Sequence, residues 1–465
     1  MMRTLVIVVL LVHANGSRAD EAPLCAGFGE VDVSPVVGGK KTVYMAGFGH
    51  NRKATALHDP IMARAVVLAQ GEKKIALVSV DVIGLFFATA EVVRAKLPGF
   101  AYVLVSSTHN HEGPDTLGLW GPSPFASGID PDYSERLEAG IVKAVQDAEK
   151  NLQPVTARAG SIAAPHLLHD DRLPIILHDE LSVLEFTTIA GKKRHGVVVQ
   201  WNCHPETLDS KNTQISADFT AATVQTLKKS QECPVVYFTG TVGGLMSSLK
   251  VKVLDTNGKE LEDGTFEKTN EYGRLLAKEA EKALKAAKPT TLTPIEVRTR
   301  TIFVPVDNTL YAFGWQLGVL KRSMYEWEGT PFPEKPREAK TLPKRAAIRT
   351  EIGHLKCGEL DIVVVPGEIY PELVLGKVQD PADPAADYPD AAIEPAVYPA
   401  LKGKHRMLIG LGNDEIGYLI PKRQWDEKSP FCYGLKKTQY GEVNSTGPEA
   451  APIICQAFAD LFKAK

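Results

Sequence analysis

The stretch AYVLVSSTHNHEGPD, residues 101–115, joins an apolar run directly to two histidines. The apolar part predicts a buried strand, and His109 and His111 follow it with one residue between them. Two adjacent imidazoles are costly to ionise together, so we expect both to be neutral, and neutral imidazoles at a strand end are typical metal ligands. A polar turn with two solvated histidines is the alternative, and this stretch alone leaves both interpretations open.

Apolar runs and helical stretches alternate on both sides of this segment. Residues 74–84, KIALVSVDVIG, and residues 233–240, CPVVYFTG, read as strands, and residues 181–205 read as a hairpin that turns at Gly191. Helical periodicity covers residues 88–97, 132–152, 217–230 and 269–287. Strands interleaved with helices predict an α/β protein, and the hairpin makes its β-sheet mixed, with helices flanking it.

The pattern changes after residue 288. Residues 326–346 and 379–404 are rich in proline and polar residues, which predicts long insertions in the C-terminal half, as loops or lids. Residues 359–368, ELDIVVVPGE, and residues 405–421, HRMLIGLGNDEIGYLIP, read as two firm strands.

Unusual polar residues follow several of the predicted strands. His204 comes after GVVVQWNC, Glu368 after DIVVVPG, and Tyr418 after RMLIG. Because ligands in open α/β sheets bind beyond the carboxyl ends of strands, this distribution is the trace that a metal site drawn from scattered segments would leave. Each residue also has a structural interpretation: a capping histidine for His204, a helix N-terminal acid for Glu368 and a core aromatic residue for Tyr418.

Bulk composition excludes some classes of protein. The 465 residues are 44% hydrophobic and 23% charged, with a net charge of −3, and the chain shows no basic face, so we expect no nucleic-acid partner. Six cysteines are sparse and lack CxxC spacing, so they do not form a zinc-ribbon signature.

The N-terminus reads as a secretory signal peptide. Arg3 precedes the apolar stretch 5–12, and Ser17 and Ala19 occupy the small-residue positions before a cut. The apolar stretch is too short to span a bilayer, and a membrane anchor is the alternative. We therefore expect a signal peptide over residues 1–19, a catalytic domain over residues 20–465, and a secreted or periplasmic protein without a transmembrane span.

Several segments together resemble the neutral, non-lysosomal ceramidases, zinc-dependent amidases that cut the N-acyl bond of ceramide. Residues 106–115, SSTHNHEGPD, are similar to the family's Ser-x-Thr-His-Thr-His-Ser-Gly-Pro segment, and residues 201–219 resemble its next histidine segment. The remaining similar segments are residues 27–38, 45–68 and 78–84 near the start, the Pro-Gly-Glu segment 366–373, and the tyrosine segments 410–421 and 438–448. We expect no counterpart of the family's additional C-terminal β-rich domain, and on that expectation ceramide itself is in doubt as the substrate.

Carried over residue by residue, the resemblance implies one Zn²⁺ ion held by His109, His204, Glu368 and Tyr418. It also implies that His111, Arg172 and Tyr440 act at the substrate's amide, and that Gly47 and Gly49 bring backbone close to the substrate. Zinc in such a shell activates water and polarises a carbonyl, and the three side chains offer donors for the oxyanion.

The resemblance fails at the nucleophile. The family carries a serine in a Gly-Asp-Val-Ser-Pro-Asn turn, whereas alignment of FTGTVGGLMSSLK, residues 238–250, places Met246 at the serine position. Ser247, one residue further, is a doubtful nucleophile because an extended backbone points it the other way.

The sequence therefore predicts a secreted zinc-dependent amidohydrolase that uses metal-activated water on a ceramide-like or other N-acylated substrate, which is a lipid or small molecule. Contact with a membrane surface is part of this expectation. The alternative is a catalytically inactive, ceramidase-like zinc-binding protein. A hydrolase of phosphate or sulfate esters lacks support because no Asp-rich cluster for two metals is present, and Asp218 is a lone acid.

Overall fold

The first β-sheet of the protein contains parallel and antiparallel pairs. The computed structural model describes residues 22–463, and within them nine strands form this sheet in the order β11-β9-β8-β6-β1-β3-β4-β5, with β13 beside β6. The pairs β4–β5 and β9–β11 are parallel and the other neighbours are antiparallel. The predicted α/β class with a mixed sheet is confirmed. The strands are β1 Leu24–Asp32, β3 Met62–Gln70, β4 Lys73–Val80, β5 Tyr102–Ser107, β6 Gln153–Ala163, β8 Glu180–Thr188, β9 Arg194–Trp201, β11 Val235–Thr239 and β13 Lys288–Thr290.

A second sheet forms from the C-terminal half. Its order is β14-β16-β17-β19, with β15 beside β16, and short strand pairs link the loops around both sheets. The strands of the second sheet are β14 Ile295–Val306, β15 Tyr325–Glu326, β16 Ala346–Cys357, β17 Leu360–Val364 and β19 His405–Ile409. The short pairs are β2 Ala56–Leu57 with β10 Gln214–Ile215, β7 His169–Asp170 with β12 Met246–Ser247, and β18 Glu368–Ile369 with β20 Tyr418–Leu419.

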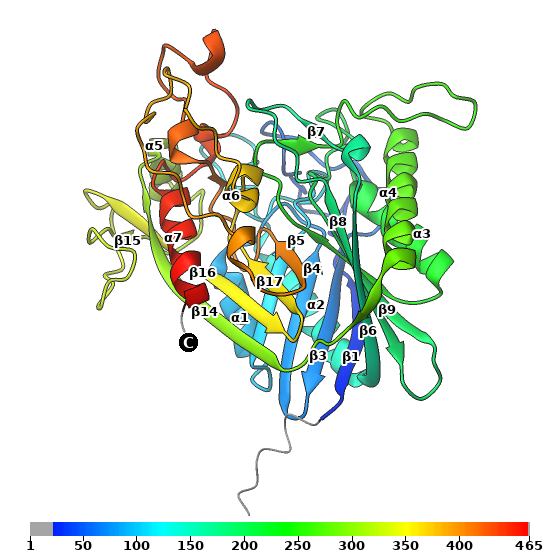
Figure 1. Ribbon diagram of the computed structural model, residues 1–465. Coiled ribbons are helices and arrows are strands. Elements are labelled where there is room, and N and C mark those ends of the chain that lie inside the picture. Colours follow the sequence, from blue (N-terminus) through cyan, green and yellow to red (C-terminus); the bar gives the residue numbers. More distant parts are fainter. Residues whose placement is uncertain (1–21, 464–465) are drawn as a thin grey trace, which may run out of the picture.

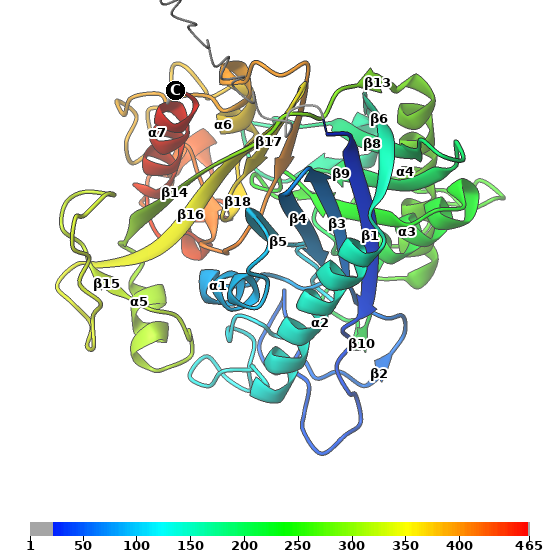
Figure 2. The ribbon, with the colours of Figure 1, turned by 90° about the horizontal axis from the view of Figure 1, so that it is seen from below.

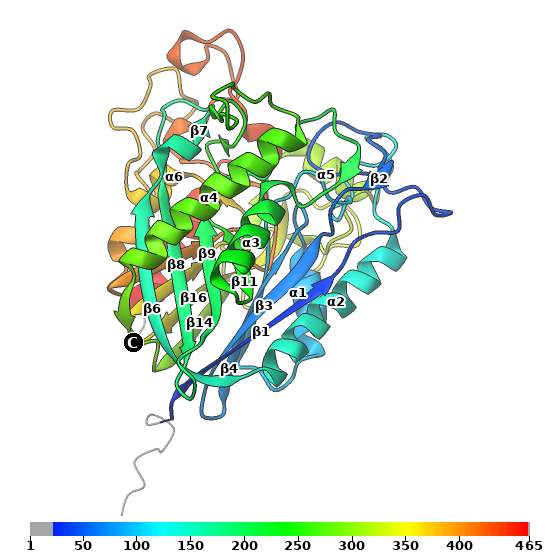
Figure 3. The same ribbon diagram turned by 90° about the vertical axis from the view of Figure 1, so that its right-hand side faces the viewer.

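Helices cover the outer faces of the two sheets (Figure 1). Helix α2 lies along β1 and β3, α3 and α4 pack side by side over β6, β8 and β11, and α7 lies over β14 and β16 (Figures 2 and 3). The helices are α1 Phe87–Ala95, α2 Pro131–Lys150, α3 Asp218–Gln231, α4 Phe266–Ala286, α5 Thr309–Gln316, α6 Pro371–Leu375 and α7 Ala450–Lys463. Short 3₁₀ turns lie at Pro165–Leu167, Tyr398–Ala400, Lys422–Gln424, Cys432–Gly434 and Glu442–Asn444.

The central strands are apolar on both faces because each face is covered. In β5, Tyr102 and Leu104 belong to the core between the two sheets, whereas Val103 and Val105 pack beneath the helices. Strands β3 and β4 divide their side chains in the same way. Alternate residues of a strand point to opposite faces, so a strand between two apolar layers needs a continuous apolar run. This is why these strands are recognisable in the sequence.

Helix ends follow local signals. Asp130 caps α2 by accepting a hydrogen bond from the Asp132 amide, and Pro131 occupies the first turn, where the missing N–H costs nothing. Thr265 caps α4 in the same way, through the Lys268 amide. These caps start the two long helices that cover the first sheet.

The first sheet curls, so that β11 at one edge approaches β3, β4 and β5 at the other. The Thr239 hydroxyl at the end of β11 donates to the Thr108 carbonyl just after β5, at 2.7 Å. The Gly410 amide, after β19 of the second sheet, donates to the Thr239 carbonyl at 3.0 Å. The carboxyl ends of three strands that are far apart along the chain therefore meet at one place.

Two expectations about the C-terminal half need correction. The predicted strand over residues 405–421 ends at Ile409, and a loop leads from there to the short strand β20. Strands β14 and β16 were missed, although they form the longest pair in the second sheet. Residues 327–345 and 379–397 are irregular, as predicted for the two insertions.

In residues 22–463 the longest helices are too polar to serve as membrane spans. The predicted signal peptide, residues 1–19, lies outside the described residues.

Candidate functional site

Two buried imidazoles lie just after the ends of β5 and β9, and a backbone carbonyl from another segment orients each of them. The His109 Nδ1 atom lies 2.8 Å from the Ile83 carbonyl oxygen, and the His204 Nδ1 atom lies 2.9 Å from the Met246 carbonyl oxygen. Because a carbonyl only accepts, each Nδ1 carries the proton and each Nε2 presents a lone pair. His109 adopts φ +65°, which is rare for a residue with a side chain, and functional sites concentrate such strain.

Glu368 and Tyr418 face these two Nε2 atoms from the second half of the chain. They are directly paired across β18 and β20. One oxygen of Glu368, Oε2, lies 3.2 Å from His109 Nε2 and 3.1 Å from His204 Nε2. The Tyr418 hydroxyl lies 3.3 Å from His204 Nε2. Each of the four side chains is at most 5% exposed. The structure therefore brings all four predicted ligands together.

The donor atoms have the spacing of a zinc shell. For bond lengths of 2.0–2.1 Å, the edges of a tetrahedron of ligands measure about 3.3–3.4 Å. Three of the six edges, His109–Glu368, His204–Glu368 and His204–Tyr418, are 3.1–3.3 Å long and thus close to these values. Burial alone would raise the pKa of Glu368, but His109 and His204 outweigh it and lower that pKa below its usual range, so the carboxyl group is ionised. Two imidazoles, a carboxylate and a phenol are side chains that fit a zinc ion chemically.

His111 lies beside this cluster with free ring nitrogens. Its ligand atom lies within 4.8 Å of those of His109 and His204, and both of its nitrogens are buried without a hydrogen-bond partner among the described residues. Burial, reinforced by His109 and His204, lowers the pKa of His111 well below its usual value. The expectation of a neutral imidazole agrees with this environment for His111. Two unpartnered nitrogens next to a candidate metal centre can bind a substrate group.

Gly47 packs closely against His111, whereas Gly49 has open space where a side chain would lie. At Gly47 the backbone has φ +96°, and an added Cβ would lie 2.5 Å from the His111 Cγ atom. At Gly49 an added Cβ would meet no atom within 4 Å. Only the first of the two predicted glycines is therefore required by close packing at the site.

We expect Gly47→Ala to lower kcat/KM by about 10- to 100-fold while bound metal is retained, because the new methyl group must displace His111. It should also cost about 1–2 kcal/mol of stability, since alanine is strained at positive φ. Steady-state kinetics, metal analysis and thermal unfolding measure the three quantities. Gly49→Ala should have a much smaller effect, and wild-type kinetics for Gly47→Ala would contradict the assigned contact.

Glu206 is a site residue that the sequence analysis missed. Its Oε2 atom lies 3.6 Å from His111 Nδ1, and its other oxygen, Oε1, accepts a hydrogen bond from the Ser247 hydroxyl. The side chain is buried, and burial raises its pKa. Its position two residues after His204, in the sequence HPE, was the available signal.

Met246 and Ser247 are both held in place by contacts with other residues. The Met246 side chain is fully buried in the core beneath α3 and α4, and its carbonyl orients His204. The Ser247 hydroxyl, in addition to its bond to Glu206, accepts from the Leu249 amide at 2.9 Å. Ser247 thus adjoins the site, but its hydroxyl is held by a carboxylate.

Arg172 is occupied by protein acceptors. Its two terminal nitrogens donate to both carboxylate oxygens of Glu442, at 2.7 and 2.8 Å, and to the carbonyls of Tyr440 and Gln424. Only Nε, which is buried and unpaired among residues 22–463, is left over. In this arrangement Arg172 holds the Tyr440 segment, and its predicted contact with the substrate stays a prediction.

Tyr440 lies at the solvent side of the cluster. Its ring centre is 5.7 Å from that of Tyr418, and its hydroxyl accepts a hydrogen bond from the side-chain Nδ2 atom of Asn444 at 2.6 Å. The side chain is 48% exposed, in contrast to the buried cluster beneath it. Tyr440 therefore connects the buried cluster to the surface of the protein.

Glu415 is a second carboxylate that the sequence analysis did not identify. One of its oxygens lies within 4.8 Å of the ligand atoms of His109 and Glu368. Oε1 accepts from the Gly417 amide at 2.7 Å, and Oε2 has no partner among the described residues. The residue is buried. Burial, reinforced by the neighbouring Glu368 carboxylate, raises the pKa of Glu415 well above its usual value.

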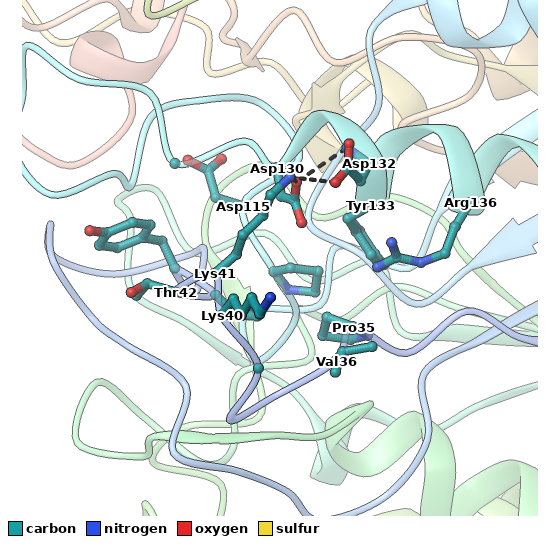
Figure 4. Close-up of a pocket in the computed structure, with 15 residues that line it drawn as sticks. Pro35, Val36, Lys40, Lys41, Thr42, Asp115, Asp130, Asp132, Tyr133 and Arg136 are labelled. Carbon is teal, nitrogen blue, oxygen red and sulfur yellow. Dashed lines mark hydrogen bonds and ion pairs between the residues drawn. The ribbon is translucent and has the colours of Figure 1, made fainter.

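A separate cavity of about 300 Å³ lies between residues 35–44 and the start of α2 (Figure 4). Lys41 is paired there with Asp130 and Asp132. Its lining includes none of the predicted site residues. Because the cavity contains none of the clustered histidines and its two acidic residues at the start of α2 are taken up by Lys41, we assign the functional site to the histidine cluster.

Comparisons with known proteins show which solved structures share this fold. No family model and no curated protein matches the chain. Among solved structures, the neutral ceramidase from Pseudomonas aeruginosa superposes with a TM-score of 0.70 and 19% identity, over 95% of this chain and 74% of that one. A ceramidase complexed with C2 gives a TM-score of 0.69 and 17% identity, over 95% and 75% of the two chains. The chain has the fold of these enzymes, and at that level the resemblance noted in the sequence is confirmed.

Proposed function

We propose that this chain is a secreted or periplasmic zinc-dependent hydrolase that cleaves the N-acyl bond of a ceramide-like or other N-acylated substrate. The observation that carries the proposal is the spacing of His109 Nε2, His204 Nε2, Glu368 Oε2 and the Tyr418 hydroxyl. These four side chains would hold the ion. The fold shared with ceramidases supports an amide substrate, and the signal-like residues 1–19 support export.

A zinc ion held there would polarise the substrate carbonyl and lower the pKa of water. His111, which is neutral and has two free nitrogens, would hydrogen-bond the amide oxygen, and Tyr440 would contribute its hydroxyl from the solvent side. Arg172 would keep Tyr440 in place by donating a hydrogen bond to the Tyr440 backbone carbonyl.

Glu206 is the group best placed to move the proton. Its Oε2 faces His111, while the Ser247 hydroxyl fixes Oε1. In the proposed reaction the Glu206 carboxylate accepts a proton from the attacking water and returns it to the amine nitrogen as the C–N bond breaks. Water and amide are converted to a carboxylic acid and an amine, and no acyl-serine is formed.

The second candidate function is a catalytically inactive, ceramidase-like zinc-binding protein. Met246 favours it, because that side chain is buried in the core at the position where the sequence alignment expects the nucleophile. The two candidates share the metal and differ in turnover.

A fluorescent short-chain ceramide separates the two candidates. With the mature chain from residue 20 and stoichiometric zinc, we expect release of the labelled fatty acid, loss of turnover on chelation and recovery when zinc is restored. Zinc-loaded protein that cleaves neither this compound nor other N-acylated amines would contradict the hydrolase proposal and support the binding protein.

A further inference from the structure

Helix α5 exposes an apolar face. Every residue of α5 is at least partly exposed. Leu310, Phe313 and Leu317, in the helix and its last turn, are spaced by three and four residues, so they share one side, and they are 64%, 49% and 44% exposed. Contiguous exposed apolar side chains on a soluble protein mark an interaction surface.

The loop 116–129 extends this surface. Leu119 and Phe125 are also exposed. Beneath them Leu117 and Leu320 are buried in one cluster, to which Trp315 of α5 adds its partly buried ring. The loop and the turn after α5 touch, since a Cβ added at Gly118 would lie 2.2 Å from the Val319 carbonyl oxygen. We call the exposed side chains Leu119, Phe125, Leu310, Phe313 and Leu317 the α5 rim.

The α5 rim borders the candidate site from two directions. Asn308, which caps α5, donates to the carbonyls of Val443 and Ser445 at 2.9 and 2.8 Å. That segment also carries Tyr440, whose ring adjoins Tyr418. On the other side, the loop 116–129 begins five residues after His111. A molecule held on the rim would thus lie beside the segment that carries Tyr440.

The unpaired exposed charges next to the rim are basic. Residues 116–129 and 308–321 contain no aspartate or glutamate, and the exposed Asp132 and Asp307 just outside them are paired with Lys41 and Arg345. Lys321 is exposed at the end of the second segment. Lys53 is exposed two residues from Asn51, whose amide donates to the Gly121 carbonyl at 2.8 Å. Apolar side chains flanked by lysines complement an anionic lipid surface.

We propose that the α5 rim docks on an anionic lipid surface and places the site entrance against it. Leu310, Phe313 and Leu317 enter the acyl region while the lysines contact the headgroups. An N-acylated amphiphile then reaches the cluster from the lipid. The docking itself requires no chemistry at the site, and only this last role rests on the proposed function.

Sedimentation with phosphatidylcholine vesicles, with and without phosphatidylglycerol, tests the docking on the mature chain. We expect binding that requires the anionic lipid and weakens with salt. Leu310→Ser combined with Phe313→Ser should weaken it by at least about tenfold. Hydrolysis of a water-soluble short-chain substrate should stay unchanged, because α5 contributes no group to the cluster.

Ile189→Ser is the matched control, because Ile189 is 53% exposed but lies in the β8–β9 turn, at the end of the strands opposite His204. It should bind vesicles as the wild type does. Failure of the wild type to bind, or equal binding by the double variant, overturns the proposal. So does a dimer in light scattering that the double variant abolishes, because the rim would then contact a second copy. Vesicle binding without turnover leaves the docking intact and rejects only the hydrolase.

Discussion

Replacing His204 with alanine is expected to remove bound zinc and abolish hydrolysis. His204 Nε2 lies within 3.3 Å of both the Glu368 carboxylate and the Tyr418 hydroxyl, so its loss removes the donor nearest to two others. Loss of a group that only orients a ligand already costs 10–100-fold in metal affinity, so we expect at least about 100-fold for a ligand itself. Titration with a zinc indicator and metal analysis after dialysis measure the loss.

The control is a buried histidine of the second sheet. His354 is similarly buried and hydrogen-bonds Asp361 at 2.9 Å, but it belongs to β16 and not to the cluster. His354→Ala should bind zinc with wild-type affinity even if it unfolds at a lower temperature. Retention of stoichiometric, tightly bound zinc by His204→Ala would exclude the proposed shell.

The second large effect is expected from Glu206→Gln. Glutamine keeps the size of the side chain and an oxygen that can accept from Ser247, but it cannot accept the proton of water. We therefore expect full zinc content and a loss of about 10²–10⁴-fold in kcat, which is the range for removal of a general base. Steady-state kinetics on the zinc-loaded variant measure it.

Ser247→Ala distinguishes this mechanism from a serine nucleophile. The substitution removes one hydrogen bond to Glu206. We expect less than about a tenfold loss in kcat, since the Glu206 carboxylate itself remains. Complete loss of activity with zinc retained would mean that Ser247 attacks the substrate, and the role assigned to Glu206 would be wrong.

The first sheet could be predicted because its central strands are covered on both sides. Strand β5 is apolar throughout since one face packs on the second sheet and the other beneath the helices. In β14, by contrast, Glu296, Arg298 and Arg300 alternate with other residues, and the chain after residue 288 is rich in proline and polar residues. The alternation was a usable strand signal, but the composition of the surrounding loops obscured it.

Site residues could be predicted where they come just after a strand that the sequence itself reveals. His109 and His204 directly follow buried strands, and Glu368 follows β17. The role of Glu206 depends on its distance to His111, which comes from another segment, and no spacing in the sequence reveals that distance. Likewise, the pairing of Arg172 with Glu442 joins residues 270 positions apart.

The central claim is that His109, His204, Glu368 and Tyr418 jointly bind one zinc ion. Anomalous diffraction at the zinc edge, from crystals of residues 20–465 grown with zinc, tests it most directly. The account predicts one strong peak per chain, about 2.0–2.2 Å from His109 Nε2, His204 Nε2, Glu368 Oε2 and the Tyr418 hydroxyl. A cluster without a peak, or a zinc ion held elsewhere in the molecule, would contradict it.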